Sequence, residues 1–188
     1  EIDGNRPKHW MWDQRNTDAT LTVDDAVSRS GRHSLKLTST TPFGAHVYGC
    51  LTLVGGVAVE PETTYTLSYY VRGKQGGCGF VGGAARWRVR ALFVTSPDRW
   101  TRVTSTFTTE ADEKSLPILA TMERPCEGVW IDDLKLEKAP RALPYVSDGG
   151  DAKPAVELSP VQPAPLAYRG SSFVPAWAPS RYPPDQMV

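Results

Sequence analysis

Hydrophobic and polar residues alternate along most of the first 138 residues, and turn-forming residues interrupt this alternation about every 8 to 12 residues. Hardly any window keeps the period of an amphipathic helix. The alternation predicts strands over residues 19–25, 34–38, 46–53, 64–72, 86–93, 101–108, 118–123 and 129–136. Short strands at this spacing, separated by Gly- and Pro-containing turns, predict an all-β fold of two packed antiparallel sheets, a β-sandwich or jelly roll.

The same alternation assigns side chains to faces. In strand 64–72, one set of side chains is expected in the core: Tyr65, Leu67, Tyr69 and Val71. The opposite set, which includes Tyr70 and Arg72, is expected to face outward. In the last strand, Ile131, Asp133 and Leu134 break strict alternation. Trp10, Trp100 and Trp130 are expected in the core, whereas Trp12 and Trp87 are left open between core and surface.

The composition changes after Lys138. Ten of the 16 prolines lie at or after Pro140, so the chain is expected to divide into a sandwich domain, residues 1–138, and an extended Pro-rich tail, residues 139–188. The tail also carries aromatic residues, so it is expected to lie against a surface as a linker or docking segment; a polyproline-type recognition peptide is the alternative. The chain begins without Met or an apolar leader, and we expect it to be a piece of a longer protein.

The charge balance and the absence of known motifs argue against several classes of function. The chain has 21 Lys and Arg against 21 Asp and Glu, which argues against nucleic acid as a partner. No apolar run approaches the roughly 18 residues of a membrane span. The three cysteines lack the paired spacing of a zinc site. No nucleophile or zinc-hydrolase motif surrounds any Ser, Cys or His, and sequential pairs such as Asp132-Asp133 should point to opposite faces of a strand, so we expect no catalysis.

Five segments in order carry a family resemblance: PKHW at 7–10, SRSGRHSLKL at 28–37, VEPETTYTLSYYVRG at 59–73, WTRVTSTF at 100–107 and VWIDDLKLE at 129–137. The series resembles the galactose-binding-like jelly-roll carbohydrate-binding modules, the superfamily of the xylan- and β-glucan-binding modules of secreted glycoside hydrolases. The resemblance covers nearly all of residues 1–138. It implies a non-catalytic, extracellular or cell-surface module that binds a polysaccharide or oligosaccharide and serves a neighbouring catalytic domain.

The resemblance also implies one structural Ca²⁺. Carried over by position, its ligands would be Glu1, a backbone carbonyl near Ser30 to Arg32, and Asp132. Carboxylate and carbonyl oxygens are the ligands that Ca²⁺ prefers. The alternative is that Asp132 and Asp133 merely end a strand and face water.

A basic segment suggests the ligand. From Arg72 to Arg102 there are seven basic residues and one acid, and Arg86, Arg88 and Arg90 point to one side of their strand. Arg forks bind planar anions and aromatic rings stack on sugars, so an anionic glycan is expected. The candidate binding residues are Tyr48, Tyr70, Arg72, Arg86, Trp87, Arg88 and Arg90. The alternatives are arginines paired with acids on a neighbouring strand, and a spacer or interaction domain that binds no sugar.

Overall fold

The computed structural model describes residues 2–4, 6–73, 78–83, 88–94, 99–122 and 124–145, which all lie in the first of the chain's two units, Glu1–Ala155. No helix in these ranges is long and apolar enough to cross a membrane. The strands in these ranges are β1 (Ile2–Asp3), β2 (Arg6–Pro7), β3 (Trp10–Arg15), β4 (Thr20–Asp24), β5 (Ser34–Ser39), β6 (Tyr48–Leu53), β7 (Val57–Ala58), β8 (Thr64–Gly73), β9 (Cys78–Gly83), β10 (Val89–Val94), β11 (Thr101–Thr108), β12 (Ser115–Leu116), β13 (Ile118–Met122) and β14 (Cys126–Glu137).

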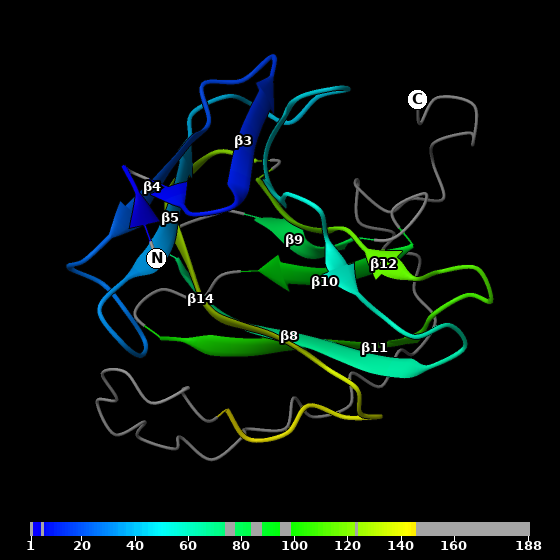
Figure 1. The fold of residues 1–188 in the computed structure, drawn as a ribbon. Coiled ribbons are helices and arrows are strands. Elements are labelled where there is room, and N and C mark those ends of the chain that lie inside the picture. The colour runs from blue at the N-terminus through cyan, green and yellow to red at the C-terminus, as the bar shows by residue number, and fades with distance from the viewer. Residues whose placement is uncertain are drawn as a thin grey trace, which may run out of the picture. The chain divides into compact units, whose positions relative to one another are not determined.

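Two five-stranded antiparallel sheets contain most of the described strands (Figure 1). We call the sheet with the strand order β10-β9-β13-β6-β3 the front sheet. The sheet with the order β11-β8-β14-β5-β4 is called the back sheet. Two short pairs, β1-β2 and β12-β7, complete the described part. The predicted two-sheet sandwich is confirmed.

The core lies between the two sheets and follows the alternation of the strands. On β8, the predicted inward residues Tyr65, Leu67, Tyr69 and Val71 are all buried. Leu51 of β6, Ile118, Ala120 and Met122 of β13, and Val89 and Ala91 of β10 meet them from the front sheet. The Tyr69 hydroxyl donates a 2.5 Å hydrogen bond to the Ala91 carbonyl, so the back sheet is tied to the front sheet across the core.

The sequence prediction missed β3, whose first four side chains alternate between half-buried and exposed. Trp10 and Trp12 pack on the core, while Met11, Asp13 and Arg15 are exposed. Trp12 also explains a glycine on β6, because a Cβ at Gly49 would lie 2.5 Å from the Trp12 ring. The prediction for Trp130 was wrong: its neighbours Val129 and Ile131 point into the core, so Trp130 faces outward, donates to Asp24 and lies beneath the Lys36 ammonium.

Part of the outer face of the back sheet, at β8 and the end of β14, is covered by the chain that follows β14. Thr66 and Ser68 of β8 face outward, yet both are buried. The Thr66 hydroxyl donates to the Ala139 carbonyl at 2.8 Å, and Glu137 accepts a hydrogen bond from the Leu143 N–H at 3.1 Å. Figure 1 shows this segment, yellow, running along the back sheet. The domain boundary expected at residue 138 stays a prediction.

An exposed carboxylate, Asp18, joins the β3–β4 connection to the end of β5. It accepts hydrogen bonds from the Thr40 N–H at 2.9 Å, from the Thr41 N–H at 3.0 Å and from the Ser39 hydroxyl at 3.0 Å. The hydroxyls of Thr40 and Thr41 donate to it as well. These bonds, led by the Thr40 hydroxyl, hold the pKa of Asp18 well below its usual value near 3.8.

This lowered pKa predicts an acid-dependent contribution to stability. Because the folded state favours the charged carboxylate, the stabilisation is fully present above the unfolded-state pKa of about 3.9 and is lost as the pH falls through the lower folded-state pKa. We expect Asp18→Asn to lower the melting temperature at pH 7 and to reduce the loss of stability between pH 5 and about pH 2.5. Thermal melts over this range test it, with Asp112→Asn on the exposed β11–β12 connection as the control; an unchanged acid profile in Asp18→Asn would contradict it.

Candidate functional site

The predicted binding residues do not share one surface. Tyr48 lies on β6 of the front sheet and Arg90 on β10, three strand positions away, about 14 Å at the usual strand spacing. Tyr70 and Arg72 lie on β8, in the back sheet. Arg86 and Trp87 fall outside the described residues. Grouping Tyr70 and Arg72 with the arginines of residues 86–90 in one binding surface was wrong, because β8 and β10 face each other across the core and are not paired in one sheet.

Arg88 is held by acidic residues of the chain itself. Its guanidinium pairs with Glu113, lies 3.1 Å from a Glu110 carboxylate oxygen and donates to the Thr108 carbonyl at 3.0 Å. Two carboxylates thus neutralise the centre of the predicted arginine row. Arg88 is therefore paired with acids of its own chain, as the alternative to ligand binding expected. These acids lie in the connection after β11 and not on a neighbouring strand.

On the outer face of the front sheet, exposed side chains of β3 lie beside half-buried side chains of β6, and we call this area the β3–β6 surface. Its residues are Met11, Asp13 and Arg15 of β3 and Tyr48 and Thr52 of β6. Cross-strand register places Arg15 opposite Tyr48 and Met11 opposite Thr52, so each pair lies side by side on one face. Within the described part of the chain, the Arg15 side chain makes no ion pair or hydrogen bond.

The side chains of β6 and β13 next to this surface are buried. Cys50, opposite Asp13, packs with Leu119 of β13 and with the half-buried Tyr48. Burial raises the pKa of the Cys50 thiol, and the negative charge of Asp13 adds to the effect. The thiol therefore stays protonated, and the polar chemistry of this half of the sheet belongs to Asp13, Arg15, Tyr48 and Thr52.

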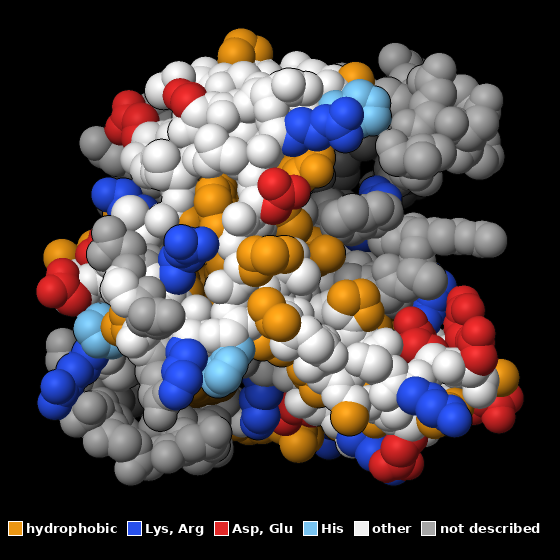
Figure 2. Space-filling model, turned by 45° about the horizontal axis from the view of Figure 1, so that its top comes forward, with side chains coloured by type: hydrophobic (Ala, Val, Ile, Leu, Met, Phe, Trp, Pro, Cys, Tyr) orange, Lys and Arg blue, Asp and Glu red, His pale blue; other side chains and the backbone are white. Residues whose placement is uncertain are grey.

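Sequence reasoning missed Arg15 and Asp13 because residues 10–15 were not assigned to a strand. The available signal was the alternation Trp-Met-Trp-Asp-Gln-Arg, which puts the two tryptophans on one face and Met11, Asp13 and Arg15 on the other. Figure 2 turns the top of Figure 1 forward and shows a band of hydrophobic side chains across this side of the molecule.

A second cluster lies on β14, where the two adjacent acids contact the same loop. The pairing of β14 with β8 shifts register between Asp132 and Lys135, and Asp133 has a φ of 52°. Asp132 accepts the Arg29 N–H at 2.7 Å, while Asp133 accepts from the Ser30 hydroxyl and pairs with the Arg29 guanidinium at 2.5 Å. The expectation that these acids point to opposite faces was wrong, because a β-bulge turns both toward residues 28–31.

Arg29 is enclosed by this cluster. Its guanidinium lies 3.5 Å from the Tyr70 ring centroid and 5.6 Å from that of Tyr145. The side chains of Arg29 and Asp133 are only 14% and 2% exposed. Tyr70, predicted to bind ligand, therefore stacks on an arginine of its own chain. Burial, and then the charge of Asp133, raise the pKa of Tyr145.

The fit of calcium can be tested on Asp132. Burial raises its pKa to about 6, the charge of Asp133 acts in the same direction, and N–H donors oppose the shift. Its Oδ2 accepts from the N–H groups of Arg29 and Ser30, and its Oδ1 accepts from the N–H of Asp133. A carboxylate has about four lone-pair sites, so one remains, on Oδ1, enough for contact with a metal ion through a single oxygen.

The other predicted metal ligands give little support to a calcium site. Glu1 lies outside the described residues, and Asp133 is occupied by Arg29 and Ser30. Across the described ranges, no three His, Cys, Asp or Glu side chains come together in a group that could hold a metal. Carbonyl oxygens near Ser30 to Arg32 would have to supply further ligands.

Residues 3–125 match the carbohydrate-binding domain family CBM_4_9, and the chain belongs to this family of non-catalytic carbohydrate-binding modules. No curated protein matches the chain significantly.

Solved structures agree on the fold. The enzymatically active domain of tailspike protein 4 of bacteriophage CBA120 has a TM-score of 0.53 and 12% identity, covering 70% of this chain and 20% of its own. The CBM22-1–GH10 modules of Clostridium thermocellum xylanase 10B, complexed with xylohexaose, have a TM-score of 0.51 and 13% identity, covering 69% of this chain and 26% of theirs. The chain thus spans about a fifth and a quarter of these two proteins.

The buried Arg29–Asp133 pair generates a stability prediction. Arg29→Gln would leave Asp133 buried without its cation, and we expect a loss of about 3 kcal/mol in the free energy of unfolding. Asp133→Asn should tolerate the positive φ, because Asn adopts this conformation more readily than most residues.

The double variant Arg29→Gln/Asp133→Asn is the matched control. Without the uncompensated charge, it should be more stable than Arg29→Gln alone. Urea unfolding of the three variants and the wild type measures this; losses that simply add would contradict a buried pair of this kind.

Proposed function

We propose that the β3–β6 surface is where this module binds its polysaccharide. The observation that carries the proposal is the placement of the exposed Arg15 directly opposite the half-buried Tyr48 on neighbouring strands. The outer face of the back sheet is less suited around β8, because residues after β14 cover that part and Tyr70 stacks on Arg29.

The chemistry of this surface favours a glycan that carries carboxylates. An Arg guanidinium offers a fork of N–H donors that matches a carboxylate, and an adjacent Tyr offers a ring face and a hydroxyl. The Asp13 carboxylate can accept hydrogen bonds from sugar hydroxyls, and the Thr52 hydroxyl can donate to them or accept from them. The arginine and tyrosine expected from the sequence are therefore found as a pair, although the arginine is Arg15 and not a member of the row at 86–90.

The module's role, in this proposal, is to hold an attached polysaccharide-active catalytic domain on its substrate outside the cell. The family assignment supports this role, and one structural neighbour carries modules of this kind beside a catalytic GH10 module. A spacer or docking domain without sugar affinity is the competing function. The two differ in one measurable property, the retention of the isolated chain by polysaccharide.

We further propose that one Ca²⁺ binds at Asp132, with Glu1 and carbonyl oxygens of residues 30–32 as the remaining ligands. The buried carboxyl with its raised pKa supports this, because a bound cation would favour the ionised form of a carboxyl that burial disfavours. The ion would have a structural role, joining the loop before β5 to β14.

Affinity electrophoresis tests the binding surface. The wild type should be retarded by glucuronoxylan more than by neutral arabinoxylan, and the retardation by glucuronoxylan should decrease as salt rises, because exposed charges are screened. Arg15→Gln should weaken binding of glucuronoxylan by about tenfold, equivalent to about 1.4 kcal/mol, and leave the melting temperature unchanged.

The control is Arg99→Gln, which removes an exposed arginine near the back sheet. Equal weakening by Arg99→Gln would show that only net charge matters and would contradict a site at Arg15. A wild type that no polysaccharide retards would favour the docking function.

Calcium removal is tested by calorimetric melting with and without chelator. A bound ion that is absent from the unfolded chain adds to stability by mass action, so the chelated protein should melt several degrees lower, and Asp132→Asn should melt at one temperature in both conditions. Identical melts of the wild type with calcium and with chelator would rule the ion out.

A further inference from the structure

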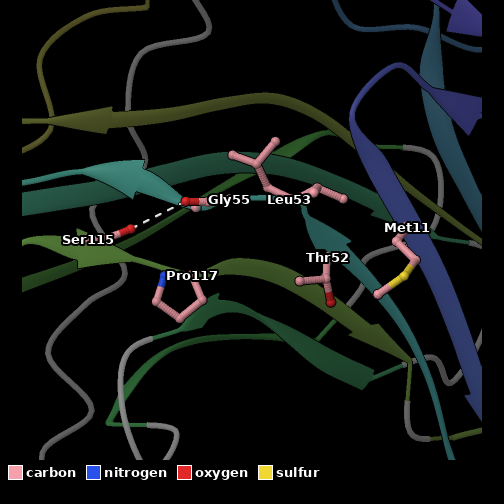
Figure 3. Close-up of a pocket in the computed structure, with 8 residues that line it drawn as sticks. Met11, Thr52, Leu53, Gly55, Ser115 and Pro117 are labelled. Carbon is pink, nitrogen blue, oxygen red and sulfur yellow. Dashed lines mark hydrogen bonds between the residues drawn. The ribbon is translucent and has the colours of Figure 1, made fainter.

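An open apolar groove adjoins the β3–β6 surface and is not explained by binding of carboxylates. It has a volume of about 410 Å³ and begins at Met11 and Thr52, the cross-strand pair at one end of that surface (Figure 3). Its walls are mostly apolar, formed by Met11, Leu53, Val54 and Pro117. Met11 and Val54 are 55% and 61% exposed, unusually open for such side chains.

Backbone conformation and hydrogen bonds hold the walls of the groove in place. The turn after β6 contains Gly55 and Gly56, whose φ values of 83° and 66° suit glycine. The Val54 N–H donates to the His9 carbonyl at 2.9 Å, which joins this turn to the segment before β3. On the other side, β12 pairs with β7, and the Ser115 hydroxyl donates to the Gly55 carbonyl, the dashed line of Figure 3.

The polar chemistry of the groove is too sparse for a bare sugar. The Ser115 hydroxyl donates to the Gly55 carbonyl and the Thr52 hydroxyl lies 3.5 Å from the Cys50 sulfur, so both polar side chains of the lining already have a partner. Sugar hydroxyls buried here would lose water without gaining partners, which costs free energy. A methyl-bearing acyl group suits the groove better, because it gains from leaving water and carries few polar atoms.

We infer that this groove binds the O-acetyl groups of a polysaccharide that lies on the β3–β6 surface. The inference deepens the proposed function and rests on it, since Met11 and Thr52 belong to both the surface and the groove. The specificity is then double: Arg15 selects a carboxylate, and the groove selects acetyl esters on the same chain. The preferred ligand is an acidic, O-acetylated glycan.

The first experiment compares O-acetylated glucuronoxylan with the same polymer after mild alkaline deacetylation. Alkali removes the acetyl esters and leaves the carboxylates, so binding through Arg15 is retained while the contribution of the groove is lost. We expect the acetylated polymer to bind about fivefold more tightly, the gain of burying about one methyl group. Val54→Ser, which changes a groove residue outside the β3–β6 surface, should remove this preference and leave affinity for the deacetylated polymer unchanged.

Ile2→Ser is the matched control, because Ile2 is an exposed hydrophobic residue of β1 outside the groove. It should keep the preference for the acetylated polymer. Equal binding of both polymers by the wild type, or loss of the preference in Ile2→Ser, would overturn the inference while leaving the proposed function intact.

The second experiment does not need polysaccharide binding by Arg15. Methionine methyl NMR should show the Met11 signal moving as O-acetylated xylo-oligosaccharides are added, and not with their deacetylated counterparts. Met122 is buried in the core and serves as the internal control. A Met11 signal that does not move up to about 10 mM ligand would overturn the inference; movement in a protein that no polysaccharide retards would uphold the groove and refute the proposed function.

Discussion

The β-bulge at Asp132 and Asp133 is the constraint on which the back sheet depends. Before it, Val129 and Ile131 point into the core; after it, Leu134 and Leu136 do so, which a strictly alternating strand cannot achieve. The bulge is stabilised because Arg29 and Ser30 bind the buried carboxylate of Asp133. Since β14 lies between β8 and β5, the loop before β5, the central strand and the covering segment with Tyr145 are fixed together.

The fold could be predicted wherever alternation was clean. The inward set of β8 was identified correctly because four large side chains recur at every second position between two turns. The short strand β3 was missed, although its two tryptophans carry the same signal. The irregular parity of Ile131 and Leu134 pointed to the bulge, but the sequence could not say that both acids would turn to one loop, since that depends on which segment packs beside them.

The candidate binding site was harder to predict, because alternation shows which side of a strand a residue faces but not which sheet that strand joins. Tyr48 was recognised, yet its partner is Arg15, more than thirty residues earlier in the chain. The local excess of arginines was real in sequence, but Glu110 and Glu113 neutralise Arg88 from a connection beyond the counted segment. A charge count along the chain cannot anticipate such pairing, because it depends on where the connection after β11 folds.

The position of β3 at the edge of the front sheet has a consequence for solubility. An edge strand offers unpaired backbone groups to any other strand, and an apolar edge promotes association between copies. β3 presents Asp13, Gln14 and Arg15 as exposed residues, while its tryptophans point inward. The charges that suit the surface to a ligand also make this edge a poor partner for another sheet, so a substitution that improved apolar contact here would do so at the risk of aggregation.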